Sequence, residues 1–149
     1  MSQPQFDHTP YTEWYIPTLD EFEVVRQVSD LNKSEMAEIL GYSERRSGYT
    51  TVLNQGNISV RRMKIGVDYF NDEGLIDWYM PEIKEIGAEV DRLDIAKKHI
   101  SESLGYQSPS SFHGAIAKEG ISYDKYRRCL LAIEFHQENG YLPLPWEIG

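Results

Sequence analysis

Residues 14–56 read WYIPTLDEFEVVRQVSDLNKSEMAEILGYSERRSGYTTVLNQG, and the chain repeats this stretch in diverged form 64 positions later. The two copies align without a gap over 43 positions and are identical at twelve of them. Two of the identities are tryptophan and proline, so the match exceeds what chance gives. The identical positions are Trp14, Tyr15, Pro17, Glu21, Asp30, Lys33, Glu38, Leu40, Gly41, Tyr42, Ser47 and Gly56. The chain is therefore a tandem duplication of one small unit.

The length of the repeat bears on how the two copies are organised. The whole chain has 149 residues, of which 40% are hydrophobic and 12% aromatic, as in globular proteins. A unit of about 64 residues is near the lower limit for an independent hydrophobic core. We expect two units packed together, with a tail at 1–13, the first unit at 14–76, and the second at 77–149 with a C-terminal extension.

Apolar residues at helical spacing predict four helices in the first unit. Thr18 and Glu21 form a predicted capping box before a helix from Leu19 to Ser29. A second helix opens at Asn32 or Ser34 and stops before Gly41, which can adopt a positive φ. A third is capped by Ser43 and ended by Gly56, and a fourth starts at Ile58.

The second unit repeats this plan. Its first predicted helix carries an apolar face of Ile83, Ile86, Val90 and Leu93, and its second covers 95–104. The third opens at Ser108-Pro109 and ends at Gly120, and the last runs from Ser122 to Asn139. On the last helix we expect Tyr126, Cys129, Leu130, Ile133 and Phe135 to face the core. No stretch alternates with the period of a strand. The prediction is an all-α fold of two tandem helix-turn-helix units of about four helices each.

Charge is distributed in register with the duplication. The net charge is −9, which by itself disfavours nucleic-acid binding. Residues 43–64 nevertheless hold five lysines and arginines against one acid, and residues 97–128 hold six against three. Both basic blocks contain the second half of a repeat, so each unit has one region suited to a negatively charged partner.

Two short stretches resemble known helix-turn-helix families. Ser34-Glu35-Met36-Ala37-Glu38-Ile39-Leu40-Gly41-Tyr42-Ser43 resembles the Cro/repressor-like motif, with alanine on the inner face and glycine in the turn. The segment 104–112, followed by Gly120-Ile121-Ser122-Tyr123 and Tyr126-Arg127, resembles the second motif of arabinose-regulator-type activators. The sequence departs from these patterns at Gly56, Ile116 and Tyr123. The resemblance implies that the third helix of each unit enters the major groove of DNA.

The helix-turn-helix arrangement assigns DNA-contacting residues in both units. Arginine can bind guanine and asparagine can bind adenine through two hydrogen bonds, whereas basic residues at the next helix suit phosphates. In the first unit the predicted contacts are Ser43, Glu44, Arg45, Arg46, Ser47, Thr50, Thr51, Asn54, Arg61, Arg62 and Lys64. In the second they are Gln107, Ser108, Ser110, Ser111, His113, Lys118, Lys125, Arg127 and Arg128, a less basic set that suits phosphates more than bases.

Other function classes have less support. The sequence has no phosphate-binding glycine motif, no nucleophile paired with a base, and no histidine or cysteine spacing typical of a metal site. We therefore expect no enzyme activity, no cofactor and no metal. No stretch is long and apolar enough to span a bilayer and no signal peptide is evident, so we expect a cytoplasmic protein without a membrane partner.

The sequence thus predicts a protein that binds double-stranded DNA in a sequence-specific way, as a small transcriptional regulator. The alternative is an acidic protein-interaction module on the same scaffold, such as an antitoxin or an inhibitor of a nucleic-acid enzyme. Whether the chain forms a homodimer or binds a protein partner stays open.

Overall fold

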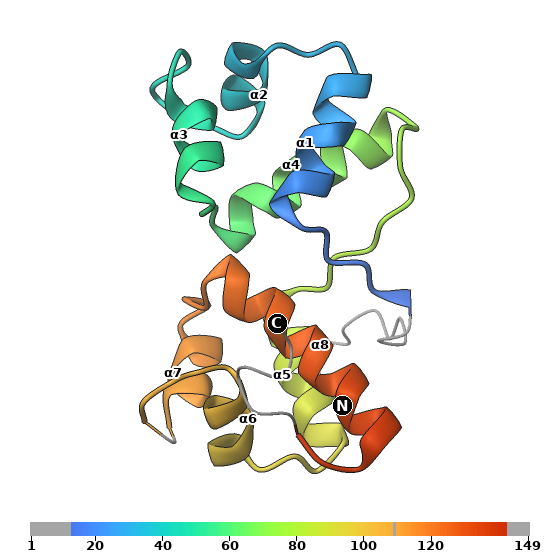
Figure 1. Cartoon of the computed structure of the whole chain (residues 1–149), viewed down its shortest axis with the longest axis vertical. Helices are drawn as coiled ribbons and strands as arrows, with labels where there is room; N and C mark the ends of the chain where they lie inside the picture. The colour runs from blue at the N-terminus through green and yellow to red at the C-terminus, as the bar shows by residue number, and fades with distance from the viewer. Residues whose placement is uncertain (1–12, 109, 143–149) are drawn as a thin grey trace, which may run out of the picture. The chain divides into compact units, whose positions relative to one another are not determined.

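The all-α prediction is confirmed: in the part of the chain that it describes, a computed structural model has eight helices in two units (Figure 1). It describes residues 13–108 and 110–142. Contacts group residues 15–80 with 122–124 as one unit, called here the N-terminal unit. Trp14 and residues 81–108, 110–121 and 125–142 form the C-terminal unit. This division lies four residues beyond the border at 76 and 77 that the repeat suggested.

Helices α1 (Leu19–Val28), α2 (Lys33–Ile39), α3 (Gly48–Gln55) and α4 (Val60–Asp72) build the N-terminal unit. Its core contains side chains from all four helices with no exposed surface, among them Phe22, Met36, Tyr49 and Met63. Phe22 also meets Phe70 with ring centroids 5.1 Å apart. Each helix thus contributes an inward apolar face, as the periodicity predicted.

Capping boxes fix the starts of α1 and α2. The Glu21 amide donates to Thr18 Oγ1 at 3.0 Å, and the Thr18 amide donates to Glu21 Oε1 at 2.8 Å. Asn32 and Glu35 make the same reciprocal pair at 2.8 and 2.9 Å, so Asn32 opens α2. These caps satisfy backbone N–H groups that have no partner within the helix.

The aromatic residues of the second copy's leading segment, Trp78 and Tyr79, pack within the N-terminal unit. The Tyr15 amide donates to the Tyr79 carbonyl at 2.7 Å, and the Tyr15 ring stacks on Trp78 with centroids 4.9 Å apart. The Asn71 side chain donates to the Trp78 carbonyl and accepts from its amide, at 2.7 and 3.1 Å. These bonds hold an extended segment without making it a strand. No strand occurs in residues 13–108 or 110–142, where Ser59 and Ser122 form an isolated antiparallel bridge.

The C-terminal unit contains α5 (Ile83–Arg92), α6 (Lys97–Ser103), α7 (Ser111–Ala117) and most of α8 (Tyr123–Asn139). Tyr126, Cys129 and Ile133 of α8 have no exposed surface, as predicted, and Leu130 is also buried. Phe135, which was predicted to face the core, is only half-buried, and its ring lies edge-on against the exposed Tyr141.

The predicted starts of the third helices are wrong. In the N-terminal unit α3 begins at Gly48 and not after Ser43, so residues 43–47 form a loop. A Cβ on Gly48 would lie 2.8 Å from the Tyr42 Cβ, so this glycine allows the turn to pack against the start of α3. In the C-terminal unit α7 begins at Ser111, because the Ser111 amide donates to the Ser108 carbonyl at 3.2 Å in a turn that precedes the helix.

Candidate nucleic-acid interface

The repeated Leu-Gly-Tyr forms the same turn in both units. Gly41 and Gly105 both have φ +83°, in the left-handed region that favours glycine. The amide of Tyr42 donates to Ala37 and that of Tyr106 donates to Ser101, at 3.0 and 2.9 Å, each closing the end of its helix. This is a Schellman arrangement, which turns the chain sharply between two helices.

Tyr42 connects this turn to α3 and α4. One side of the residue packs on Gly48, at the start of α3. The guanidinium carbon of Arg62, in the first turn of α4, lies 3.9 Å from the centre of the Tyr42 ring. A guanidinium at this distance over an aromatic face is held by a cation–π interaction. The basic start of α4 is therefore fixed beside the start of α3.

A shallow hollow of about 440 Å³ opens next to this tyrosine in the N-terminal unit. Its lining includes Arg61, Arg62 and Ser59, together with Leu40, Gly41 and Ile65. Ser59 caps α4 by accepting a hydrogen bond from the Arg62 amide at 3.2 Å. Two guanidinium groups and a helix N-terminus thus border one hollow, which is an arrangement suited to an anion.

The loop at 43–47 contains the two arginines that were predicted to start the recognition helix. Both are exposed. Arg45 Nη1 lies 3.2 Å from Glu38 Oε2 of α2, with both side chains more than half exposed. A pair this exposed contributes little free energy, so Arg45 can exchange Glu38 for another anion.

Helix α3 presents an uncharged polar face beside this loop. Tyr49 and Val52 are buried in the core, whereas Thr51, Asn54 and Gln55 are exposed and Thr50 is half-buried. The exposed side chains carry hydroxyl and amide groups, which can donate and accept hydrogen bonds. Gln55 was not among the predicted contacts, although its position one residue after Asn54 could have suggested it.

An ion-paired network fixes the orientation of α3 on α1. Glu23 accepts two hydrogen bonds from Arg26, both at 2.7 Å, and one from the Tyr49 hydroxyl at 2.8 Å. The hydrogen bonds from Arg26, with a smaller contribution from Tyr49, lower the pKa of the Glu23 carboxyl to about 2. Burial, together with the hydrogen bond to Glu23, raises the pKa of Tyr49. Sequence patterns did not indicate this network, because its members are up to 26 positions apart.

Lys64 is less available than the neighbouring arginines. Its Nζ donates to the Met80 carbonyl at 3.2 Å and lies 4.0 Å from the Asp68 carboxylate. Of the predicted contacts in the N-terminal unit, Ser43, Glu44, Arg45, Arg46, Ser47, Thr51, Asn54 and Arg61 are exposed, while Thr50, Arg62 and Lys64 are half-buried.

The C-terminal unit repeats the tyrosine–cation pair in a weaker form. Lys125 Nζ lies 5.0 Å from the centre of the Tyr106 ring. Arg127 is less suited to phosphate binding, because its Nε is buried without a hydrogen-bond partner. Gln107, Ser108, Ser110, His113 and Lys118 are exposed, while Ser111, Lys125, Arg127 and Arg128 are half-buried. The exposed residues here are mostly neutral, as the sequence indicated.

Comparisons with protein-family models, with curated proteins and with solved structures give no significant match. Functional inference therefore rests on the chain's own geometry. Within the described ranges, no group of three or more histidine, cysteine, aspartate or glutamate side chains is placed to hold a metal ion. In the same ranges, no helix combines the length and hydrophobicity needed to cross a membrane.

Proposed function

We propose that the chain is a sequence-specific double-stranded DNA-binding protein, with the N-terminal unit acting as a helix-turn-helix and α3 lying in the major groove. The observation that supports this most directly is the packing around Tyr42. This residue contacts the start of α3 on one side and carries the Arg62 guanidinium on the other. Phosphate-binding and base-facing groups then lie beside each other, as the motif requires.

Base contacts come from the exposed face of α3 and from the loop before it. Asn54 has the amide geometry that binds adenine, and Thr51 can contact base edges or thymine methyl groups. Because Arg45 and Arg46 precede α3, they approach DNA from the loop and suit the groove edge or phosphates. A small transcriptional regulator is the role that fits such a protein.

Salt dependence of DNA binding tests this function. Neutralising one phosphate contributes a slope of about −0.9 to log K against log salt concentration. Contacts from Arg45, Arg46, Arg61 and Arg62 predict a slope of roughly −4 from the N-terminal unit. We would measure fluorescence anisotropy of labelled random duplex DNA between low and physiological salt. Absence of binding at low salt would refute the proposal.

Charge-matched variants identify the contacting residues. Arg61→Ala and Arg62→Ala should each reduce the slope by about 1. Lys98→Ala removes one positive charge from an exposed position of α6 in the C-terminal unit and should leave the slope unchanged. An equal effect of all three variants would show that only the net charge matters.

The net charge of −9 favours a second candidate, an acidic protein-interaction module that binds a basic partner. This function predicts no DNA binding at any salt concentration. It also predicts that Arg62→Ala has no effect on partner binding, whereas replacing surface carboxylates weakens it. The anisotropy experiment therefore separates the two functions.

A further inference from the structure

The exposed face of α3 carries only uncharged polar side chains. Asn54 and Gln55 come three and four residues after Thr51, so the three side chains lie on one side of the helix. All three are exposed, while Tyr49 and Val52 on the opposite side are buried in the core. The helix contains no lysine, arginine, aspartate or glutamate. Its outer face therefore differs in chemistry from the arginines that lie around it.

The three side chains are free to bind and are held in direction. In the part of the chain that the structure describes, none of them makes a side-chain hydrogen bond. The Tyr49 hydroxyl donates to Glu23 of α1 at 2.8 Å, which fixes the rotation of α3 about its axis. Gly56, with φ +66°, ends the helix directly after the last of them, and its amide donates to the Val52 carbonyl at 2.8 Å. The three side chains therefore keep helical spacing.

Side chains of these types select adenine and thymine. In the major groove, the carboxamide of asparagine or glutamine donates a hydrogen bond to adenine N7 and accepts one from the adenine amino group. A threonine methyl group can pack on the methyl group of thymine. Guanine is read by arginine or lysine, and cytosine by aspartate or glutamate. Because α3 has none of these four residue types, its face lacks the groups that best read G·C pairs.

The length of the face sets how many base pairs it reads. Residues four apart on a helix are separated by about 6 Å along its axis, and successive base pairs of DNA by about 3.4 Å. The segment from Thr51 to Gln55 therefore reaches about three adjacent base pairs.

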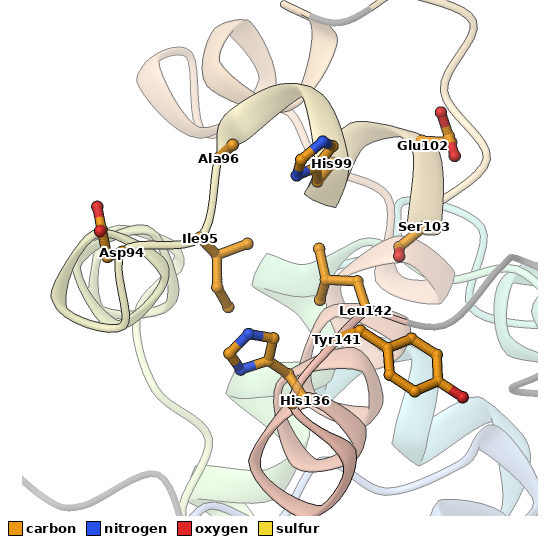
Figure 2. A pocket seen from close by; sticks show the side chains of 10 residues that line it. Asp94, Ile95, Ala96, His99, Glu102, Ser103, His136, Tyr141 and Leu142 are labelled. Atoms are coloured by element: carbon orange, nitrogen blue, oxygen red, sulfur yellow. The ribbon is translucent and has the colours of Figure 1, made fainter.

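The C-terminal unit has no comparable face on its third helix. Helix α7 contains neither asparagine nor glutamine. An open pocket of about 480 Å³ in this unit is formed by α6, the segment before it and the end of α8 (Figure 2). Its described lining includes the acidic Asp94 and Glu102 but no lysine or arginine, so it does not suit the negatively charged phosphates of DNA. Adenine readout from a third helix is thus confined to the N-terminal unit.

We propose that α3 reads a short run of adjacent A·T base pairs in the major groove, with Gln55 as a base-reading residue beside Asn54. Each carboxamide binds one adenine through two hydrogen bonds, and Thr51 packs on a thymine methyl group. Such A·T readout rests on the DNA-binding function proposed above and specifies which sequences the protein recognises.

Selection from a random duplex library tests the A·T readout. The enriched sequences should share one run of about three A·T pairs, each pair bound by a carboxamide being favoured at least about fivefold over G·C. In the selected site, 7-deazaadenine in place of adenine removes the N7 acceptor and keeps base pairing. Affinity in the anisotropy assay should then fall at least about fivefold. Unchanged affinity would overturn the proposal, because the A·T preference would then come from the shape of the DNA.

Variants assign the readout to residues. Gln55→Ala should relax the preference at one base pair and leave the salt slope unchanged. Gln137→Ala makes the same change at an exposed position of α8 and should alter neither. Gln55→Arg should convert the preference at that base pair from adenine to guanine, because arginine binds guanine through two hydrogen bonds. If both Gln55 variants select the wild-type sequence, Gln55 does not read bases and the proposal is overturned.

Two outcomes separate the base assignment from the DNA-binding function. If the protein binds DNA with a salt slope of roughly −4 but the enriched sequences share no A·T run, the function stands and the base assignment is wrong. If the protein does not bind random duplex DNA at low salt, the function is refuted and the A·T readout with it.

Discussion

Glu23→Gln should destabilise the protein at neutral pH but not in acid. The carboxylate accepts hydrogen bonds from Arg26 and from Tyr49, and its side chain is only 16% exposed. Its pKa is lowered from 4.5 to about 2 in the folded state. A lowered pKa means that the ionised form stabilises the fold, fully above pH 4.5 and progressively less as the pH falls toward 2.

The expected size follows from this shift in pKa. A shift of about 2.5 units corresponds to a ceiling of about 3 kcal/mol, at 1.36 kcal/mol per unit. Solvent screening of the partly exposed carboxylate reduces this to about 1–2 kcal/mol. Glutamine keeps the shape and one acceptor oxygen, so packing changes little. The difference between wild type and variant should therefore be about 1–2 kcal/mol at pH 7 and should approach zero near pH 2.

Urea unfolding followed by far-UV circular dichroism at pH 7, 5, 4 and 3 measures the difference. Glu38→Gln is the matched control, because it removes a carboxylate from an ion pair with Arg45 in which both side chains are at least 60% exposed. That pair should contribute less than about 1 kcal/mol. A difference for Glu23→Gln that is absent at pH 7, or that stays constant down to pH 3, would refute the assigned role of the network.

Three further predictions concern packing, the tyrosine–cation pair and the cysteine. Gly66→Ala should lower the thermal midpoint of unfolding by several degrees, because a Cβ there would lie 2.4 Å from the Phe22 ring. Gly114→Ala in α7 is the control: its Cβ meets nothing within 4 Å, so it should not destabilise the protein. Tyr42→Leu should weaken DNA binding severalfold, because it releases the Arg62 guanidinium that stacks on the ring, whereas Tyr42→Phe keeps the ring and should leave binding unchanged. Equal affinities of the two variants in the anisotropy assay would contradict this. Cys129 is fully buried and burial raises its pKa to about 12, so a thiol reagent should modify it only after urea unfolds the protein. Rapid reaction of the native protein would show that the core opens.

Local signals in the sequence predicted much of the fold. The capping box at Thr18 and the glycine ending α2 depend on a few adjacent residues, and the structure confirms both. The start of α3 could not be predicted in the same way. Ser43 is a good capping residue, but packing of Tyr42 on Gly48 decides where the helix begins. Tertiary contact overrides local preference at this position.

The register of the repeat from the third helix onward also required the structure. An alignment at a constant shift of 64 pairs Lys125 with Arg61. In the structure, however, Arg62 stacks on Tyr42 as Lys125 does on Tyr106. The equivalent cation is therefore Arg62. The second copy lacks one residue in the loop before α7, because α3 begins six residues after Tyr42 and α7 begins five after Tyr106. Contacts between residues about 20 positions apart revealed this equivalence, which identities alone did not.

Divergence between the copies indicates which unit is better suited to reading bases. At the position of Glu23 the second copy has Gly87, and Phe112, the second residue of α7 and buried, takes the place that Tyr49 has in α3. These two line a hollow of about 240 Å³ between α5 and α7, where the first copy has its hydrogen-bonded network. Base readout requires side chains held in fixed positions by a supporting shell. Since α3 is tied to α1 through Glu23 and α7 has no counterpart of that network, the N-terminal unit is the one that we expect to determine sequence specificity.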